Sequence, residues 1–177
     1  MVTGPSGVGK GTLIKALLER VPGLELAVSA TTRSPREGER NGIDYHFLSD
    51  GDFDRRVAAG EFVEHAVYAG NRYGTLRTEL ARPARGIVLE IDLQGARQVR
   101  DTLPEARQIF IEPPSFEALE ERLRRRAADT PEQIERRLAA ARAEIEAASE
   151  FDHRIVNDDL ERALQELTAL VATMSSP

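Results

Sequence analysis

The stretch that decides the fold of this chain is Gly4-Pro5-Ser6-Gly7-Val8-Gly9-Lys10-Gly11-Thr12, close to its first residue. Its glycines let the backbone turn so that amide N–H groups point at one anion, and Lys10 adds a mobile positive charge. An ordinary Gly/Pro turn before a helix is the alternative, but the spacing of the glycines and the Gly-Lys pair favours a loop that holds nucleotide phosphates. We therefore expect phosphate contacts from Gly4, Ser6, Gly7, Val8, Gly9, Lys10, Gly11 and Thr12.

One position departs from the usual phosphate-loop pattern. The residue after the lysine is normally a Ser or Thr whose hydroxyl touches Mg²⁺, and here it is Gly11. We expect Thr12 to serve the phosphates instead, and the metal ion to be held mainly through water. An amphipathic run over residues 13–18 follows, which predicts that the loop opens a helix whose N-terminus also favours negative charge.

Composition indicates a folded, cytoplasmic protein of one domain. The 177 residues are 41% hydrophobic and 31% charged, which suits a chain that buries a core and argues against disorder. The lack of cysteine excludes disulfides, thiolate metal sites and cysteine nucleophiles. No apolar run approaches the roughly 20 residues of a membrane span, and no signal peptide precedes the phosphate loop. The net charge of −6 disfavours nucleic acid as a partner, and the sequence leaves a homo-oligomer open.

Short apolar segments alternate with helical patterns along most of the chain. The strand candidates are residues 1–3, 24–29, 87–92, 109–111 and 154–156, of which Ile87–Asp92 has the nearly continuous apolar character of a buried parallel strand. The helical patterns cover residues 96–101, 117–126, 132–149 and 160–174. Strands that alternate with helices predict an α/β fold with a parallel central sheet flanked by helices.

Two segments interrupt this alternation. Residues 33–86 are rich in Gly, Arg, Tyr and acids, and we interpret them as an insertion that folds over the ligand-binding edge of the sheet. Residues 122–142 are rich in Arg and charged on most faces, which is typical of a solvated helix pair and also of a lid that carries arginines to phosphates. The core of the single domain would then comprise residues 1–32, 87–121 and 143–177.

Polar side chains in the insertion suit a second phosphate site. Arg33 and Arg36 are three residues apart, and Pro35 restricts the turn between them, so that paired N–H donors can grip one phosphate. Tyr45 and Tyr73 offer hydroxyl donors to the same group. Each arginine alone is typical of a surface position, and it is the combination with a phosphate loop that favours an acceptor site.

Two acids follow the apolar strand candidate. Glu90 and Asp92 are two residues apart and therefore face the same side of a strand. An acid at a strand end near a phosphate loop is placed to orient Mg²⁺ and its waters, and Asp92 is our candidate for that task. The rival interpretation is that Asp92 caps the helix that begins near Gly95.

Taken in order, these motifs resemble those of guanylate kinase, the enzyme that phosphorylates GMP. They are GPSGVGKGT at 4–12, SATTRSPREGE at 29–39, GIDYHF at 42–47, EFVEH at 61–65, NRYGT at 71–75, LEIDLQG at 89–95 and IVNDD at 155–159. The resemblance spans nearly all 177 residues. It implies the P-loop nucleoside monophosphate kinase fold, with 33–86 as the NMP-binding region and 122–142 as a helical lid, and transfer of the γ-phosphate of ATP to GMP with Mg²⁺.

The resemblance also implies roles for individual residues. It assigns the GMP phosphate to Arg33, Arg36, Tyr45 and Tyr73, the guanine base to Ser29, Glu64 and Thr75, and a GMP contact to Glu90. It places Asn157 near the adenine of ATP, and it gives the transferring phosphate to Lys10, Arg126 and Arg137, with Arg122 as a weaker candidate. The glycine that follows the lid arginine in the family is absent here, which leaves open which lid arginine reaches the phosphates.

The chemistry of the base agrees with the assignment of Glu64. Guanine presents a ring N–H and an amino group side by side, and one carboxylate accepts from both, whereas adenine would leave that carboxylate unsatisfied. A surface acid at a strand end is the alternative for Glu64, and a residue that turns the chain after a strand is the alternative for Asn157.

Two other functions stay open at the level of sequence. One is a kinase of another small phosphate ester, such as ribose 1,5-bisphosphate kinase, although a sugar acceptor has no use for Ser29, Glu64 and Thr75. The other is a non-catalytic guanylate-kinase-like module that binds proteins. Such modules typically lose the phosphate loop and the lid arginines, which this chain keeps.

Overall fold

The computed structural model describes residues 1–68, 70–125 and 130–173, and its contacts group the chain into two compact units. One, here called the phosphate-loop unit, comprises Met1–Pro22 and Arg107–Pro177. The other, here called the hairpin unit, comprises Gly23–Ala106. The predicted division into core, NMP-binding region and lid follows function and not contacts, so it stays a prediction.

The sheet of the phosphate-loop unit is parallel throughout. Its strand order is β1 (Val2–Thr3), β8 (Ile109–Glu112), β9 (His153–Val156), with Val2 opposite Ile109 and Ile109 opposite His153. The middle strand is buried along its apolar run, as expected when helices cover both faces of a parallel sheet. The strands predicted at 1–3, 109–111 and 154–156 are confirmed.

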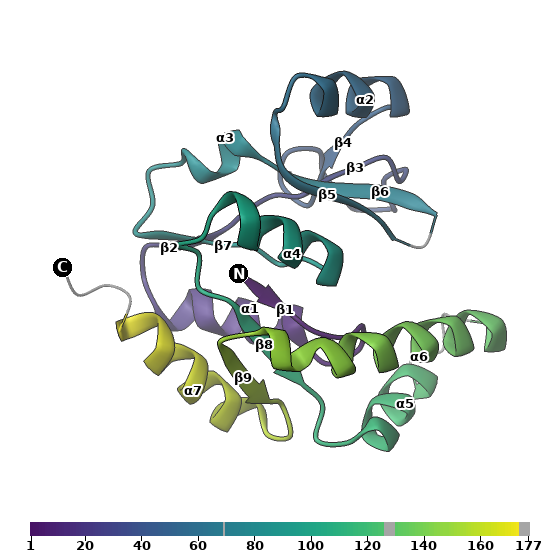
Figure 1. Ribbon diagram of the computed structural model, residues 1–177, viewed down its shortest axis with the longest axis vertical. Coiled ribbons are helices and arrows are strands. Elements are labelled where there is room, and N and C mark those ends of the chain that lie inside the picture. The colour runs from purple at the N-terminus through teal and green to yellow at the C-terminus, as the bar shows by residue number, and fades with distance from the viewer. Residues whose placement is uncertain (69, 126–129, 174–177) are drawn as a thin grey trace. The chain divides into compact units, whose positions relative to one another are not determined.

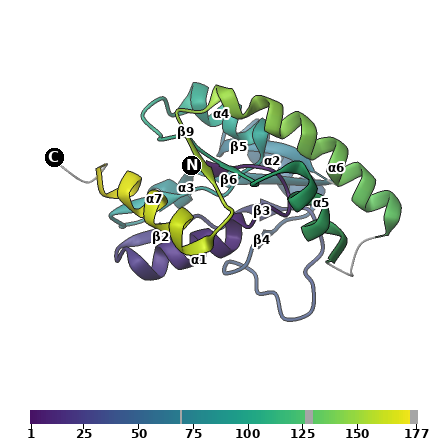
Figure 2. The same ribbon diagram turned by 90° about the horizontal axis from the view of Figure 1, so that it is seen from below.

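Two long helices of this unit pack against each other. Helix α1 (Lys10–Arg20) and helix α7 (Leu160–Thr173) lie side by side (Figures 1 and 2). Both bury leucines, Leu13 and Leu17 from α1 and Leu164 and Leu167 from α7, which removes one apolar face of each helix from water.

The Arg-rich segment is also helical on both sides of its undescribed residues. Helix α5 (Phe116–Arg125) buries Leu119, and helix α6 (Pro131–Glu146) continues into the 3₁₀ helix η1 (Ala147–Glu150). The start of α6 is fixed by a capping box, in which Thr130 accepts from the amide of Gln133 and the Gln133 side chain accepts from Thr130.

The hairpin unit is built on a mixed sheet with the order β4-β3-β6-β5. These strands are β3 (Ala30–Thr31), β4 (His46–Phe47), β5 (Phe62–Tyr68) and β6 (Asn71–Leu76), and β5 and β6 form an antiparallel pair. Phe53 of helix α2 (Asp50–Ala58) stacks on Phe62 with a ring distance of 4.5 Å. The unit also contains helix α3 (Arg77–Leu80) and a parallel pair of β2 (Leu24–Leu26) with β7 (Gly86–Val88).

Helix α4 (Leu93–Thr102) lies along the edge strand β5 (Figure 1). Polar side chains one helical turn apart on this helix bond to the backbone of that strand. Gln94 donates to the carbonyl of Val67 at 3.3 Å, and Gln98 exchanges two bonds with the backbone of His65, at 2.7 and 3.1 Å. The Thr102 hydroxyl donates to the carbonyl of Val63, two residues before His65 on the strand, at 3.4 Å. Four helical residues rise about 6 Å and two strand residues about 6.6 Å, so the two spacings match and the helix is held in register with the strand.

The predicted strands 24–29 and 87–92 are longer than the observed ones. The paired residues end at Leu26 and Val88, and one further bond joins the amide of Ala27 to the carbonyl of Val88. Leu89 and Ile91 are buried although they lie outside β7. Their apolar character therefore reflects burial in the core and not sheet pairing. Among the described residues, no helix has the length and apolar character needed to cross a membrane.

Candidate functional site

The loop after β1 has the backbone shape that its glycines require. Gly4 has φ +141°, and a Cβ at this position would lie 2.3 Å from the carbonyl oxygen of Ile111 in β8. Gly9 has φ +99°, in the left-handed region, and forms the N-cap of α1. A side chain at Gly4 would collide with the backbone of β8, and a side chain at Gly9 would be strained by its positive φ.

The N-terminus of α1 is open to an anion. No side chain among the described residues caps this helix, and its first turn, from Lys10 to Leu13, carries no acid. The amide of Leu13 is bonded to the carbonyl of Gly9, and the amides of Gly11 and Thr12 before it point toward the helix start, where phosphate oxygens can accept from them. The Lys10 ammonium lies over the same loop and donates to the carbonyls of Gly4 at 2.6 Å and Pro5 at 3.2 Å.

Asn157 and Arg122 hold the loop from the side. Asn157, at the end of β9, is buried and donates from Nδ2 to the carbonyl of Val8 at 2.8 Å. Arg122 of α5 donates to the same carbonyl at 3.3 Å and to the carbonyl of Asn157 at 3.0 Å. A Cβ on Gly9 would meet the Asn157 amide at 2.6 Å. Both side chains thus support the backbone of the loop.

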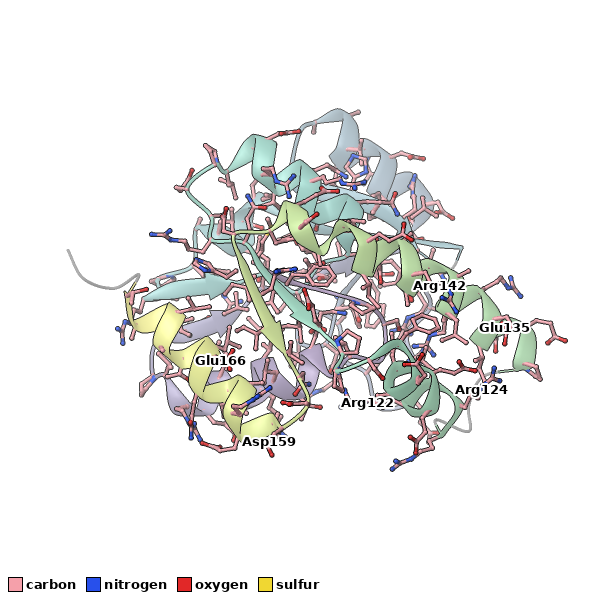
Figure 3. The ribbon with its side chains drawn as sticks, turned by 60° about the horizontal axis from the view of Figure 1, so that its bottom comes forward. Arg122, Arg124, Glu135, Arg142, Asp159 and Glu166 are labelled. Carbon is pink, nitrogen blue, oxygen red and sulfur yellow. The ribbon has the colours of Figure 1, made fainter. Side chains whose placement is uncertain are left out.

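Besides Arg122, a second predicted lid arginine contacts the loop. Arg137 of α6 donates to the hydroxyl of Ser6 at 2.7 Å. Arg126, the other lid arginine predicted with Arg137, lies outside the described residues. Arg124 instead pairs with Glu120 and with Glu135, at 3.0 Å, and so joins α5 to α6 (Figure 3).

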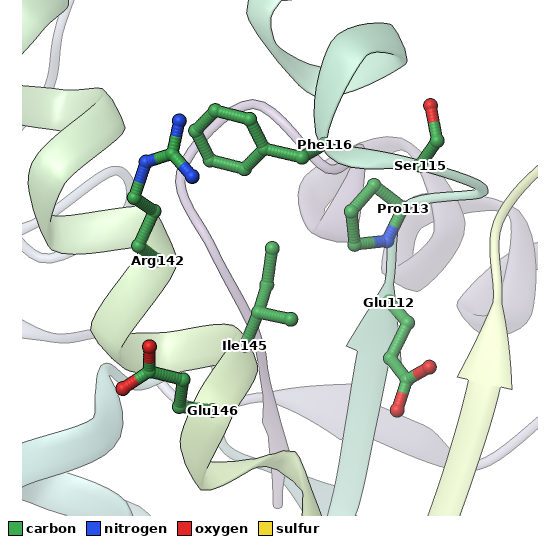
Figure 4. A pocket seen from close by; sticks show the side chains of 7 residues that line it. All are labelled: Glu112, Pro113, Ser115, Phe116, Arg142, Ile145 and Glu146. Atoms are coloured by element: carbon green, nitrogen blue, oxygen red, sulfur yellow. The ribbon is translucent and has the colours of Figure 1, made fainter.

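A pocket of about 280 Å³ lies elsewhere in this unit, between the start of α5 and the C-terminal half of α6. Arg142 stacks over the ring of Phe116 at 3.8 Å on one wall, and Pro113 and Ile145 contribute further apolar surface (Figure 4). None of the predicted site residues lines it. This pocket is therefore separate from the nucleotide contacts predicted from the sequence.

In the hairpin unit, Glu39 organises both predicted phosphate-binding arginines. Its carboxylate accepts from the Arg33 guanidinium at 2.8 Å and from the backbone amide of Arg36 at 2.7 Å. The side chains of Arg33 and Glu39 are 15% and 19% exposed, so this pair is shielded more than a surface ion pair. The sequence analysis did not single out Glu39, although it lies within the same motif.

The two predicted tyrosines lie against Arg33. The guanidinium of Arg33 is 5.2 Å from the ring centre of Tyr45, and the rings of Tyr45 and Tyr73 are 6.2 Å apart. Burial raises the pKa of Tyr45, and the charges of Tyr73 and Glu90 add to that rise while Arg33 opposes it. The phenol therefore stays a neutral hydrogen-bond donor in the working pH range. Arg36, in contrast to Arg33 and Tyr45, is exposed.

Glu64 is a buried acid and not a surface one. Its exposure is 4%, and its Oε1 accepts from the Thr75 hydroxyl at 2.7 Å. Burial raises the pKa of Glu64 to about 7, and the nearby Asp92 adds to the rise while the Thr75 bond opposes it. A Cβ on Gly95 would lie 2.5 Å from Glu64 Oε2, so only glycine leaves room for the carboxylate at this position. Gly95 is a second residue whose place in the site was not predicted from the sequence.

Asp92 caps α4, as the rival interpretation held. Its Oδ1 accepts from the amide of Gly95 at 2.8 Å, which leaves the second carboxylate oxygen for another donor. Ser29, which precedes β3, accepts from the backbone amide of His46 through its carbonyl at 2.9 Å. In residues 1–68, 70–125 and 130–173 no group of three or more His, Asp or Glu side chains is arranged to hold a metal ion.

Three comparisons place known proteins beside this chain. The family model described as guanylate kinase matches residues 1–174. The guanylate kinase of Nostoc sp. is 56% identical over 168 residues, which cover 93% of this chain and 84% of the relative. That of Thermosynechococcus vestitus is 53% identical over 180 residues, which cover 100% and 93%. The crystal structure of guanylate kinase from Anaplasma phagocytophilum matches with a TM-score of 0.78 at 34% identity, over 99% of this chain and 85% of that one.

Proposed function

The chain belongs to the guanylate kinase family, whose members are ATP:GMP phosphotransferases, and from that premise we propose which residues carry out the transfer. Family membership confirms the function that the motifs indicated, together with the P-loop nucleoside monophosphate kinase fold. The alternatives, a sugar-phosphate kinase and a non-catalytic binding module, find no support in the comparisons.

The donor, ATP, would be bound by the phosphate-loop unit. The N–H groups of the loop, from Gly4 to Thr12, would surround its phosphates, and Lys10 would exchange its two carbonyl partners for phosphate oxygens. Arg137 is supported as a phosphate ligand by its contact with Ser6 in the loop. Asn157 would lie near the adenine, and Arg126 stays a second candidate from the lid.

The acceptor, GMP, would be bound by the hairpin unit. Arg33, Arg36, Tyr45 and Tyr73 would hold its phosphate, and the clustering of three of them supports this assignment. Ser29, Glu64 and Thr75 would hold guanine, with Glu90 as a further GMP contact. The observation that carries the proposal is the buried pair of Glu64 and Thr75, because a buried carboxylate with one oxygen already bonded selects a base that donates to the other.

Mg²⁺ fits a site of this kind, because it usually keeps several waters and takes substrate phosphates with one or two protein groups. We propose two candidates for such a group, considered one by one. They are Asp92, through water and its second carboxylate oxygen, and, as the weaker candidate, the exposed Thr12. When bound, the ion would supply positive charge that neutralises the phosphates. Gly11 has no hydroxyl to offer, which is why few direct protein ligands are expected.

The residues of this chain would act by position and charge. Lys10 and the lid arginines would neutralise the transferring group, and the arginine and tyrosine cluster would keep the acceptor phosphate in line with the γ-phosphate. No general base is proposed, because the acceptor phosphate is already ionised. A closing lid would exclude water, which competes with GMP as an acceptor.

Cellular location, oligomeric state and the division into functional parts complete the proposal. Absence of cysteine is consistent with a cytoplasmic enzyme, and we keep a homo-oligomer as an open partner. The division into a core, an NMP-binding region at 33–86 and a lid at 122–142 remains our proposal for how the parts act.

One assay tests these assignments together. ADP formation by the purified chain is measured with ATP and Mg²⁺ against GMP, AMP, CMP, UMP and ribose 1,5-bisphosphate, and turnover with GMP alone is expected. The variant that tests the base site is Glu64→Gln. Its side-chain NH₂ group is a donor, and it would face the N–H donors of guanine. Its kcat/KM for GMP should fall by about tenfold or more, since a buried polar mismatch costs roughly 1–3 kcal/mol. An unchanged value in a folded variant would remove Glu64 from the base site.

A further inference from the structure

Glu79 of α3 is a buried acid that three residues contact and that has no role in the proposed chemistry. It is 7% exposed, and its Oε1 lies 2.9 Å from Nε2 of His46. Its Oε2 accepts from the backbone amide of Val28 and from the Arg82 guanidinium, both at 2.9 Å. Arg82 in turn donates to the carbonyl of Leu26 at 3.1 Å and pairs with Glu25. Both oxygens of one buried carboxylate are therefore engaged.

Two of the three partners of Glu79, Val28 and His46, lie next to residues of the proposed GMP site. Val28 precedes Ser29, and His46 follows Tyr45. The two segments are also joined to each other, because the amide of His46 donates to the carbonyl of Ser29 at 2.9 Å.

Glu79 lies within the same small network as the base-binding strand. It follows Thr75 by four residues, with only the end of β6 and the first turn of α3 between them. One carboxylate therefore joins the segment before β3, the start of β4 and the end of β6.

We propose that Glu79 is a positioning residue for GMP, which fixes the backbone that carries Ser29, Tyr45 and Thr75 so that base and phosphate contacts form together. This inference rests on the proposed assignment of those three residues to GMP. Glu79 itself does not contact the nucleotide.

The energetics explain why an acid is used at this position. A buried carboxylate is costly unless hydrogen bonds and opposite charge compensate it, and here two donors and a guanidinium do so. A single neutral side chain cannot accept at both oxygens from Val28, Arg82 and His46 together. Its replacement therefore leaves a buried donor unpaired and lets the segments shift.

The test is Glu79→Gln, which keeps the size of the side chain and removes one acceptor. We expect KM for GMP to rise about tenfold, while kcat and KM for ATP change by less than about threefold, since misplaced binding groups weaken the ligand that they position. The matched control is Glu25→Gln, which removes the other acid paired with Arg82 without touching Val28 or His46. In the control, kcat, KM for GMP and KM for ATP should stay within about twofold of the wild-type values.

The outcomes separate this inference from the proposed site. Tyr45→Phe is measured in parallel: if it leaves KM for GMP unchanged, the proposed GMP site is wrong. If Tyr45→Phe weakens GMP and Glu79→Gln does not, the positioning role is wrong. Equal losses for ATP and GMP, or the same loss in Glu25→Gln, would show a general structural role and overturn the proposal. Should Glu79→Gln fail to fold, His46→Phe removes one partner only, and an unchanged KM for GMP in that variant overturns the proposal.

Discussion

The anion sites that we propose in the phosphate-loop unit and in the hairpin unit are built by different physical means. In the first, the anion site is made of backbone: glycine turns, loop amides and carbonyls that hold Lys10 and Asn157. In the second, it is made of side chains that other side chains hold in place, as Glu39 holds Arg33. A backbone site is encoded in a few consecutive residues, whereas a side-chain site requires a folded sheet to bring its parts together.

The largest effect expected from this difference is that of Lys10→Ala. The backbone of the loop survives the substitution, but the only lysine of the loop is lost, so kcat should fall by about 10³-fold or more. GMP affinity, measured by titration calorimetry without ATP, should stay within about twofold of the wild-type value, because the residues that we propose for GMP belong to the other unit.

Lys15→Ala is the matched control for Lys10→Ala. Lys15 is exposed on the same helix and should be dispensable for turnover. A Lys10→Ala enzyme with near-normal kcat would contradict the assignment of the donor site to this loop.

The second effect concerns the approach of α4 to β5. Gly95→Ala places a methyl group 2.5 Å from the carboxylate of Glu64, which must then move. We expect KM for GMP to rise between about 10- and 100-fold, because displacement of about 1 Å has such consequences in binding sites. Gly51→Ala is the control, since a Cβ at that helical glycine meets nothing within 4 Å. An equal KM for GMP in the two variants would mean that GMP binding does not depend on the position of the Glu64 carboxylate.

The third effect is the pH dependence of GMP binding. Burial raises the pKa of Glu64 to about 7, and guanine donates to the ionised form, so the apparent affinity should rise about tenfold between pH 6 and pH 8. The phosphate of GMP also titrates near pH 6. Glu64→Gln therefore serves as the reference, and its weaker affinity should show only the part due to the phosphate. Parallel pH profiles for the two proteins would exclude Glu64 as the titrating group.

The same contrast explains what the sequence predicted. The phosphate loop, the helix that follows it and the strands at 109–111 and 154–156 depend on contiguous patterns, and the structure confirms these elements. The family and its reaction also followed from motifs, and the comparisons confirm them. Local chemistry is sufficient where the backbone itself makes the site.

The parts that sequence analysis missed are those that depend on distance in the fold. The strand predicted at 87–92 was too long, because apolar residues after Val88 are buried without being paired to β2. Gly95 and Glu79 gave no signal, since their importance comes from Glu64 and His46, which lie more than 30 residues away in sequence. The side-chain roles predicted for the GMP site remain predictions until the variants are measured.

The smallest expected effect is on the pH dependence of folding stability. It measures the free-energy cost of burying the ionised Glu64 carboxylate in the hairpin unit. The pKa of Glu64 is 4.5 in its ordinary state and about 7 in the folded protein, so the folded state binds this proton more tightly. The stabilisation that results is complete below pH 4.5 and is lost as pH rises through about 7. Between pH 6 and pH 8 the free energy of unfolding should fall by roughly 1 kcal/mol relative to Glu64→Gln, measured by urea unfolding at each pH. A difference between the two proteins that stays constant over this range would mean that Glu64 is not desolvated in the folded state. A difference that grows in the opposite direction would mean that its ionised form is the one that the fold stabilises, as expected of a carboxylate held by strong donors and not of one placed ready for guanine.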